Sequence, residues 1–182
     1  MSQPSLRLLG QLVTLREFVS SDIDAALAVV GDPTVTDYLS FDAKSRPQTA
    51  EMIDGILSRA VQVPRTEYYL AVEHEQSLIG FARLGLAGVQ AAKLGYAIRP
   101  DLWGRGYATD AVRALATFGF QHLGLHRISA AIGPDNAASV SVVKRVGFTH
   151  EGRIRDHVFT NGAWRDSLLY SLLTHEWPRD SV

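Results

Sequence analysis

Seven short stretches of the chain either alternate between hydrophobic and polar residues or are continuously apolar, and both patterns predict β-strands. The stretches are residues 12–18, 67–73, 78–86, 94–98, 126–132, 148–158 and 164–173. A polar turn at 74–77 joins the second and third of them as a hairpin. Asn161-Gly162 is typical of a second tight turn, because both residues tolerate a left-handed backbone. The last two strands are therefore expected to form a closing hairpin.

Between these strands, apolar residues recur at spacings of three and four, which places them on one face of a helix. Helices are predicted at residues 23–30, 47–60, 109–118 and 139–146, and a short helical turn with a loop at 34–41. Pro47 suits the first position of its helix, because proline lacks the N–H that would be unpaired there. Strands on both sides of a central strand–helix–strand–helix unit predict an α+β fold with a mixed sheet covered by helices. We expect a single domain spanning residues 1–182.

Composition narrows the functional classes. With 46% hydrophobic and 20% charged residues, the chain is typical of a soluble globular protein. A formal net charge of -1 offers no basic surface for nucleic acid or for a membrane. The absence of cysteine excludes disulfides, thiolate metal sites and a cysteine nucleophile. The N-terminal residues lack the pattern of a signal sequence and no 18-residue apolar segment occurs, so the expected location is the cytoplasm.

No metal site is expected. His122 and His126 are four residues apart, as metal ligands on a helix are, but Gly124 between them breaks the helix that this spacing needs. No nearby carboxylate completes a ligand set.

Residues 94–111 predict a strand, a glycine-rich turn and a helix in succession. Gly104 and Gly106 allow the backbone to turn tightly and to approach a ligand closely. The helix that follows exposes unpaired N–H groups at its N-terminus, where anions bind. We therefore interpret the turn as a binding site for a pyrophosphate.

Two familiar nucleotide motifs do not fit this turn. A P-loop requires Gly-Lys followed by Ser or Thr, whereas this chain has Gly106-Tyr107-Ala108. A dinucleotide fold requires a third glycine where Thr109 stands, and an acidic residue about 20 positions later that this chain lacks. The expected ligand is therefore another phosphate carrier.

Asn136 and Ser139 open the last predicted helix and allow two interpretations. Asn136 can be a helix cap, which contributes about 1 kcal/mol. Alternatively, both side chains face the ligand groove, because helices that follow the central strands begin at the same edge of the sheet. The pattern leaves both interpretations open.

The segment from Trp103 to Ala111 resembles the acyl-CoA-binding motif of the GNAT superfamily of N-acetyltransferases, Gln/Arg-x-x-Gly-x-Gly/Ala. Gly106 and Ala108 occupy its two small positions, whereas Trp103 stands where Gln or Arg is commoner. The chain is also similar to the RimJ/RimL-type branch of this superfamily, in Asn136-x-x-Ser139, in the sequence 146–148 and in the closing hairpin 161–170. Members of this branch are ribosomal-protein-alanine N-acetyltransferase-like proteins, and they acetylate protein N-terminal amines. The resemblance extends from about residue 12 to residue 177.

The resemblance implies a mostly antiparallel, seven-stranded mixed sheet with a central splay, flanked by about four helices. It implies acetyl-CoA as the co-substrate, no metal, and an amine acceptor; homodimers are common in this branch. The implied acetyl-CoA contacts are the backbone of Ala97, Ile98 and Arg99 for pantetheine, the N–H groups of Gly104, Arg105, Gly106, Tyr107, Ala108 and Thr109 for pyrophosphate, Asn136 for the pantetheine arm and Lys144 for the 3′-phosphate.

The implied reaction is the attack of a neutral amine on a thioester. Many members of the superfamily place a tyrosine seven residues after the asparagine, but Val143 stands there and cannot donate a proton. Ser139 is therefore the candidate catalytic residue, as a hydrogen-bond donor to the departing thiolate. No carboxylate is singled out as the base; Glu67, Asp156 and His157 are candidates.

The pKa of the acceptor amine favours a peptide N-terminus. An α-amine with a pKa of about 8 is about one-tenth neutral at pH 7, whereas a lysine amine is neutral in roughly one molecule in two or three thousand. An α-amine thus needs only a weak base. A small-molecule amine such as an antibiotic or polyamine remains an alternative acceptor, and a non-catalytic acyl-CoA-binding module is an alternative function. The sequence leaves open whether the acyl group is acetyl or longer.

Overall fold

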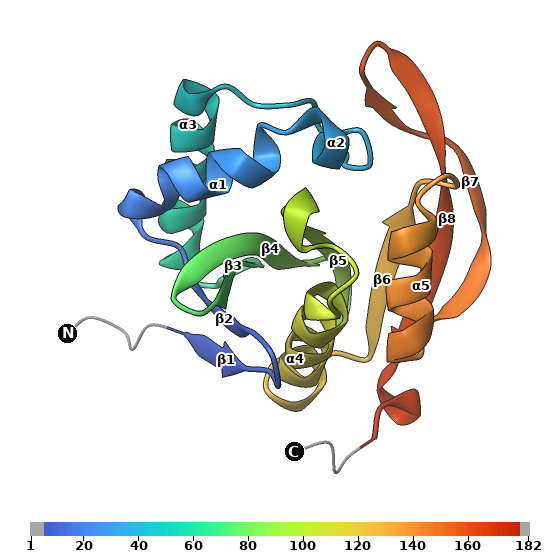
Figure 1. Cartoon of the computed structure of the whole chain (residues 1–182). Coiled ribbons are helices and arrows are strands. Elements are labelled where there is room, and N and C mark those ends of the chain that lie inside the picture. The colour runs from blue at the N-terminus through green and yellow to red at the C-terminus, as the bar shows by residue number, and fades with distance from the viewer. Residues whose placement is uncertain (1–5, 179–182) are drawn as a thin grey trace.

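A computed structural model describes residues 6–178, and its strands form one sheet (Figure 1). The strand order in the sheet is β1-β2-β3-β4-β5-β6-β8-β7. The strands are β1 (Arg7–Leu9), β2 (Thr14–Glu17), β3 (Glu67–His74), β4 (Ser77–Leu86), β5 (Ala91–Ile98), β6 (Arg127–Ile132), β7 (Thr149–Thr160) and β8 (Ala163–Leu173). All neighbours pair antiparallel except β5 and β6, which are parallel.

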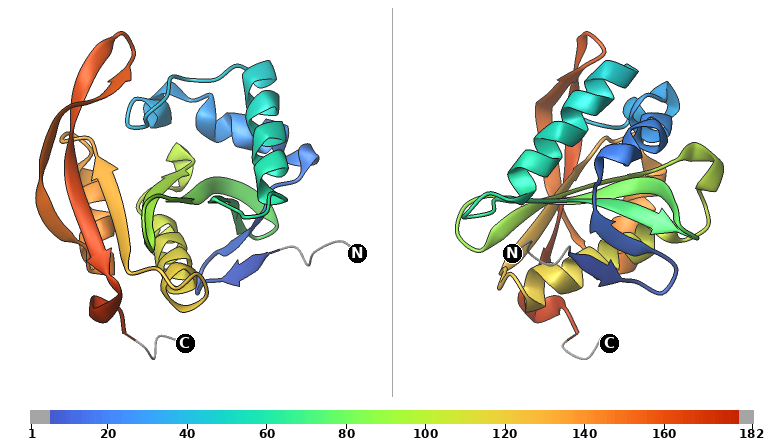
Figure 2. Two further views of the ribbon diagram at one scale, coloured as in Figure 1. Left: turned by 180° about the vertical axis from the view of Figure 1, so that it is seen from behind. Right: turned by 90° about the vertical axis from the view of Figure 1, so that its left-hand side faces the viewer.

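Helices cover both faces of this sheet (Figures 1 and 2). They are α1 (Ile23–Val30), α2 (Pro33–Thr36), α3 (Arg46–Ala60), α4 (Tyr107–Gln121) and α5 (Ala137–Val146), with single 3₁₀ turns at Ser20–Asp22, Pro100–Leu102 and Thr174–Glu176. Helices α1 and α3 lie over one face of β3 and β4, and α4 lies on the opposite face. Helix α5 packs beside α4 and against β6.

The sheet splays apart at its centre. Strands β5 and β6 pair only from Ala91 to Lys93, opposite Arg127 to Ser129. Beyond Lys93 the two strands diverge, so that the last five residues of β5 present an edge without a partner strand on that side. The divergence opens a wedge in the sheet between β5 and β6. Helix α5, which follows β6, lies along this wedge opposite β5.

Two hydrophobic cores hold the layers together. Strand β3 contributes to both, because alternate side chains point to opposite faces: Leu70 and Val72 face α4, and Tyr69 and Ala71 face α1 and α3. Each fully buried leucine stabilises the fold by roughly 1.5–3 kcal/mol. Coverage on both faces explains why β3 is nearly continuously apolar rather than strictly alternating.

The predicted α+β class is confirmed, and all seven predicted strands are present with ends shifted by a few residues. The structure adds β1, a three-residue edge strand that is too short for its pattern to be recognised. The turn predicted at 34–41 contains α2, whose N-terminus is capped by Asp32 through the N–H of Thr34. None of the helices in residues 6–178 is long and apolar enough to cross a membrane.

Candidate functional site

The glycine-rich turn takes the backbone conformation that its sequence requires. Gly104 and Gly106 have φ angles of +74° and +85°, which residues with a Cβ rarely adopt. Gly106 is the N-cap of α4 and provides no side chain to occupy the free N–H groups of the first helical turn. These N–H groups therefore stay available to an anion at the positive end of the helix dipole.

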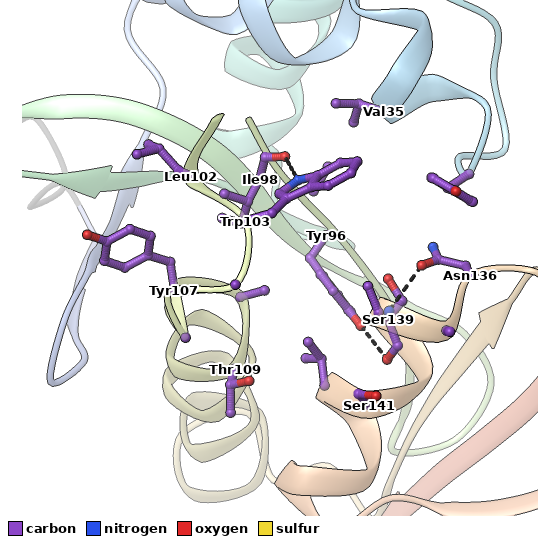
Figure 3. Close-up of a pocket in the computed structure, with 18 of the residues that line it drawn as sticks. Val35, Tyr96, Ile98, Leu102, Trp103, Tyr107, Thr109, Asn136, Ser139 and Ser141 are labelled. Atoms are coloured by element: carbon purple, nitrogen blue, oxygen red, sulfur yellow. Dashed lines mark hydrogen bonds between the residues drawn. The ribbon is translucent and has the colours of Figure 1, made fainter. Parts of the chain in front are cut away.

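A pocket of about 460 Å³ lies in the wedge between β5 and α5 (Figure 3). Its walls come from the end of β5 with the turn that leads into the start of α4, from one side of α5, and from the segment around α2. The α2 segment contributes Val35, Tyr38 and Leu39. The pocket thus brings together three stretches that are distant in sequence, within residues 35–39, 96–109 and 135–145.

Most of the predicted acetyl-CoA contacts line this pocket. They are Ala97, Ile98, Gly104, Arg105, Gly106, Tyr107, Ala108, Thr109 and Asn136, together with the predicted catalytic residue Ser139. The roles of these residues stay predictions, but the structure places them around one cavity.

Arg99 and Lys144 lie apart from the pocket lining. The guanidinium of Arg99 is paired with Asp101, with Nε–Oδ1 and Nη2–Oδ2 distances of 2.7 and 3.0 Å, and its backbone N–H donates to the carbonyl of Ile79. Lys144 is on the exposed side of α5, where Ser141 and Arg145 line the pocket instead. The predicted contacts of Arg99 and Lys144 stay predictions without support from the cavity.

The structure shows Asn136 as a helix cap, and its role toward a ligand stays a prediction. Its side-chain oxygen accepts a hydrogen bond from the backbone N–H of Ser139 at 3.0 Å, as a helix cap does. The two residues also line the pocket. Capping therefore fixes the side chain of Asn136 at the edge of the pocket.

The sequence analysis missed two aromatic side chains of the site, Tyr96 and Trp103. The hydroxyl of Tyr96 donates to the carbonyl of Ser139 at 3.1 Å, and burial raises the pKa of this phenol to about 12. The indole N–H of Trp103 donates to the carbonyl of Ile98 at 2.6 Å. Tyr96 fits the alternation of the strand predicted at 94–98, and Trp103 stands out in the sequence only as an unusual residue of the glycine-rich motif. The structure places both in the lining of the pocket.

A network behind the turn holds it in place. The carboxylate of Asp110 accepts hydrogen bonds from the backbone N–H groups of Gln11, Leu12 and Val13 at 3.0, 2.7 and 2.9 Å. His74 Nδ1 lies 2.9 Å from the carbonyl of Leu12, which can only accept, so Nδ1 carries the proton. In the neutral ring Nε2 then accepts from the hydroxyl of Tyr107 at 3.0 Å. The β1–β2 loop is thereby fixed to the start of α4.

Arg165 on β8 holds the α2 segment, which forms one wall of the pocket. Its guanidinium donates to the carbonyls of Asp37 and Leu39 at 2.6 and 2.8 Å, and Gly133 at the end of β6 lies against the same side chain. The N–H of Asn161 at the hairpin tip donates to Asp42 at 2.8 Å. The α2 segment is thus tied to the closing hairpin across the open end of the splay.

None of the three candidate bases lines the pocket. Glu67 is held by Arg59 and Arg83; burial alone would raise the pKa of this carboxyl, but the hydrogen bonds from both arginines lower it. His157 is bonded to Ser167. Asp135 is the one carboxylate among the described residues of the pocket lining, and residues 6–178 contain no cluster of three potential metal ligands.

Comparisons with known proteins agree with this geometry. A family model described as "Acetyltransferase (GNAT) domain" matches residues 13–149. The chain is 29% identical over 168 residues to the protein named "Uncharacterized N-acetyltransferase p20" from Bacillus licheniformis, covering 91% of this chain and 94% of the relative. It is 32% identical over 106 residues to the "[Ribosomal protein uS5]-alanine N-acetyltransferase" of Escherichia coli, covering 57% of this chain and 55% of that protein.

The solved structures extend the comparison to the fold. Mycobacterium smegmatis RimJ in complex with CoA-disulfide matches with a TM-score of 0.81 and 22% identity, covering 96% of this chain and 89% of RimJ. This likeness shows that the splayed sheet and its helices have the same arrangement in both proteins.

Proposed function

This chain belongs to the GNAT acetyltransferase family, and we propose that it transfers the acetyl group of acetyl-CoA to the α-amino group at the N-terminus of a protein or peptide. Members of this family use acetyl-CoA, and the relatives of the chain include N-acetyltransferases named for ribosomal proteins. One observation carries the proposal: the N-terminus of α4 has no side-chain cap, and it lines the same pocket as the unpaired edge of β5.

The residues of the pocket fit acetyl-CoA. The N–H groups from Gly104 to Thr109 would hold the pyrophosphate, because they line the pocket where α4 begins and a helix N-terminus attracts anions. The guanidinium groups of Arg105 and Arg145 line the same cavity and supply positive charge for phosphates. Asn136 would bond the pantetheine arm beside the edge of β5. Once bound, the co-substrate supplies an acetyl thioester, which is the activated acyl group.

The residues of the chain then orient the acceptor amine and stabilise developing charge. A backbone N–H on the unpaired edge of β5 would polarise the acetyl carbonyl, because a fixed donor placed where negative charge develops lowers the barrier most effectively. The hydroxyl of Ser139 would donate to the sulfur. The N-terminus of α5 lies beside the hydroxyl of Ser139 and favours a negatively charged leaving group.

The lining of the pocket supports an α-amine as the acceptor. Asp135 is the one carboxylate among the described lining residues, and it is exposed. The lining therefore offers no buried carboxylate that could act as a strong general base. An amine with a pKa of about 8 has a neutral fraction hundreds of times larger than that of a lysine side chain at pH 7. A peptide N-terminus can therefore react through a water or Asp135, whereas a lysine would require a stronger base.

The experiment that tests the proposal is a thiol-release screen with acetyl-CoA. The panel contains peptides with free N-termini, the same peptides with blocked N-termini, aminoglycosides and polyamines. We expect thiol release with free N-termini and background rates with blocked ones. Release with the small amines alone would identify a small-molecule acetyltransferase, and CoA binding without any release would identify a non-catalytic module.

Three broader features accompany this proposal. We treat residues 1–182 as one domain, which the continuous sheet from β1 to β8 supports. We place the activity in the cytoplasm, since its relatives include an enzyme named for a ribosomal protein. The homodimer expected from the resemblance stays a prediction, which sedimentation velocity can test.

A further inference from the structure

Tyr96 crosses the wedge between the two halves of the sheet. It extends from the unpaired edge of β5 toward the first turn of α5, where its hydroxyl meets the carbonyl of Ser139 (Figure 3). The ring is half-buried: one side packs on the core, and the other faces the pocket. The phenol thus lies against the backbone of the first turn of α5, at Ser139.

The other tyrosine hydroxyl near the turn is committed elsewhere. Tyr107 donates to His74, and Figure 3 shows its ring directed away from Tyr96 and Ser139. The inward-facing residue one turn after Ser139 is Val143, which is fully buried and cannot donate. Tyr96 and Ser139 both line the pocket, and the hydroxyl of Tyr96 contacts α5 at the backbone of Ser139.

The start of α5 is also where a negative sulfur is most stable. The dipole of this ten-residue helix places partial positive charge at its N-terminus. A thiolate that leaves at this point needs hydrogen-bond donors in a fixed position, since donors that reorganise during the reaction contribute less. The ring of Tyr96 is held in place by its packing on the core, so only its O–H has to rotate toward the sulfur.

We propose that the hydroxyl of Tyr96 donates a hydrogen bond to the departing thiolate sulfur, which makes Tyr96 a catalytic residue beside Ser139. This inference rests on the proposed function. The amine nitrogen forms a bond to the acetyl carbon, the carbon–sulfur bond breaks, and its electron pair leaves on sulfur. The attacking nitrogen loses its extra proton to water and becomes the amide nitrogen, and Tyr96 keeps its own proton throughout.

Two properties of Tyr96 suit this role. To reach sulfur, its O–H turns away from the carbonyl of Ser139, which still accepts the helical hydrogen bond from the N–H four residues later. The raised pKa of about 12 keeps the phenol protonated at every working pH. Because a thiol has a pKa of about 8.5, the phenol shares its proton with the thiolate and does not transfer it.

The test measures the pKa of the CoA thiol bound to the protein, from the ultraviolet absorbance of the thiolate against pH. A hydrogen bond from Tyr96 stabilises the thiolate, so Tyr96→Phe should raise the pKa of the bound thiol by about one unit. The turnover of acetyl-CoA should fall about 10- to 100-fold, while the dissociation constant of acetyl-CoA changes less than about threefold. The matched control is Tyr170→Phe, which removes a buried phenol that does not line the pocket.

Each result decides the inference. If the pKa of the bound thiol is unchanged in Tyr96→Phe, or if turnover and affinity fall equally, Tyr96 has only a structural role, as a contact between β5 and α5. Incorporation of 3-fluorotyrosine at position 96 keeps the shape of the side chain and strengthens the donor, so it should lower the pKa of the bound thiol even if the phenylalanine variant does not fold. Failure of the unmodified protein to bind CoA would overturn the proposed function itself, and this inference with it.

Discussion

Replacing Asp110 tests how the glycine-rich turn is supported from behind. The carboxylate of Asp110 accepts one hydrogen bond on Oδ1, from the N–H of Gln11, and two on Oδ2, from those of Leu12 and Val13. These bonds connect the first turn of α4 to a loop nearly a hundred residues earlier in the chain. Asp110→Ala removes all three acceptors at once.

The magnitude follows from the burial of each N–H. A hydrogen bond to a charged group contributes about 1.5–3 kcal/mol, but water replaces it where the donor is exposed. Gln11 and Leu12 are exposed, whereas Val13 is buried. We therefore expect Asp110→Ala to lower the free energy of unfolding by about 2–4 kcal/mol. Asp110→Asn keeps one oxygen for Leu12 and Val13, and should lose only about 1–2 kcal/mol.

Urea unfolding followed by circular dichroism measures these differences. The matched control is Asp101→Ala, which removes an exposed carboxylate that is also held by two hydrogen bonds, both from Arg99. Exposed ion pairs contribute little to stability, so we expect no measurable change in the control. The reasoning is refuted if Asp110→Ala unfolds at the same urea concentration as Asp101→Ala.

Three further predictions concern the site and its pH dependence. Gly106→Val should weaken acetyl-CoA binding at least about tenfold by calorimetry, because a β-branched residue at φ +85° displaces the N–H groups of the turn. The control Gly88→Val imposes similar strain at φ +77° in a loop outside the pocket lining, and it should leave the affinity for acetyl-CoA unchanged. Acetyl-CoA should change the intrinsic fluorescence through Trp103, whose indole N–H donates to the carbonyl of Ile98; a full response in Trp103→Phe would contradict this. Hydrogen bonds from arginine and serine side chains lower the pKa of Glu151 from 4.5 to about 2, so its stabilising effect is present above pH 4.5 and is lost as the pH falls toward 2. The difference in urea midpoint between the unmodified protein and Glu151→Gln should shrink over that range, and a constant difference would exclude this origin.

Local chemistry made part of the site predictable from the sequence. The two glycines of the turn, the helix that follows them and the cap at Asn136 each depend on neighbouring residues, and each is found where it was predicted. The Asn161-Gly162 turn likewise has both residues at positive φ, as its composition requires. These features need no information from distant parts of the chain.

The remaining features depend on contacts between distant residues. Arg165 is bound to carbonyls 126 and 128 positions earlier, and no sequence pattern signals such a pair. The alternating pattern of its strand predicts that Tyr96 is buried. Tyr96 lines a cavity because β5 and β6 separate after Lys93. The separation of two parallel strands changes neither strand's periodicity, so the splay was implied by the family resemblance and not by the pattern.

The central claim is that the acetyl group moves from acetyl-CoA to a peptide N-terminus. The most direct measurement incubates the protein with acetyl-CoA and a peptide that carries both a free α-amine and an internal lysine, and locates the added acetyl group by tandem mass spectrometry. We predict acetylation at the N-terminal residue, with one thiol released for each peptide modified. Acetylation of the lysine, or CoA release without a modified peptide, would contradict the account.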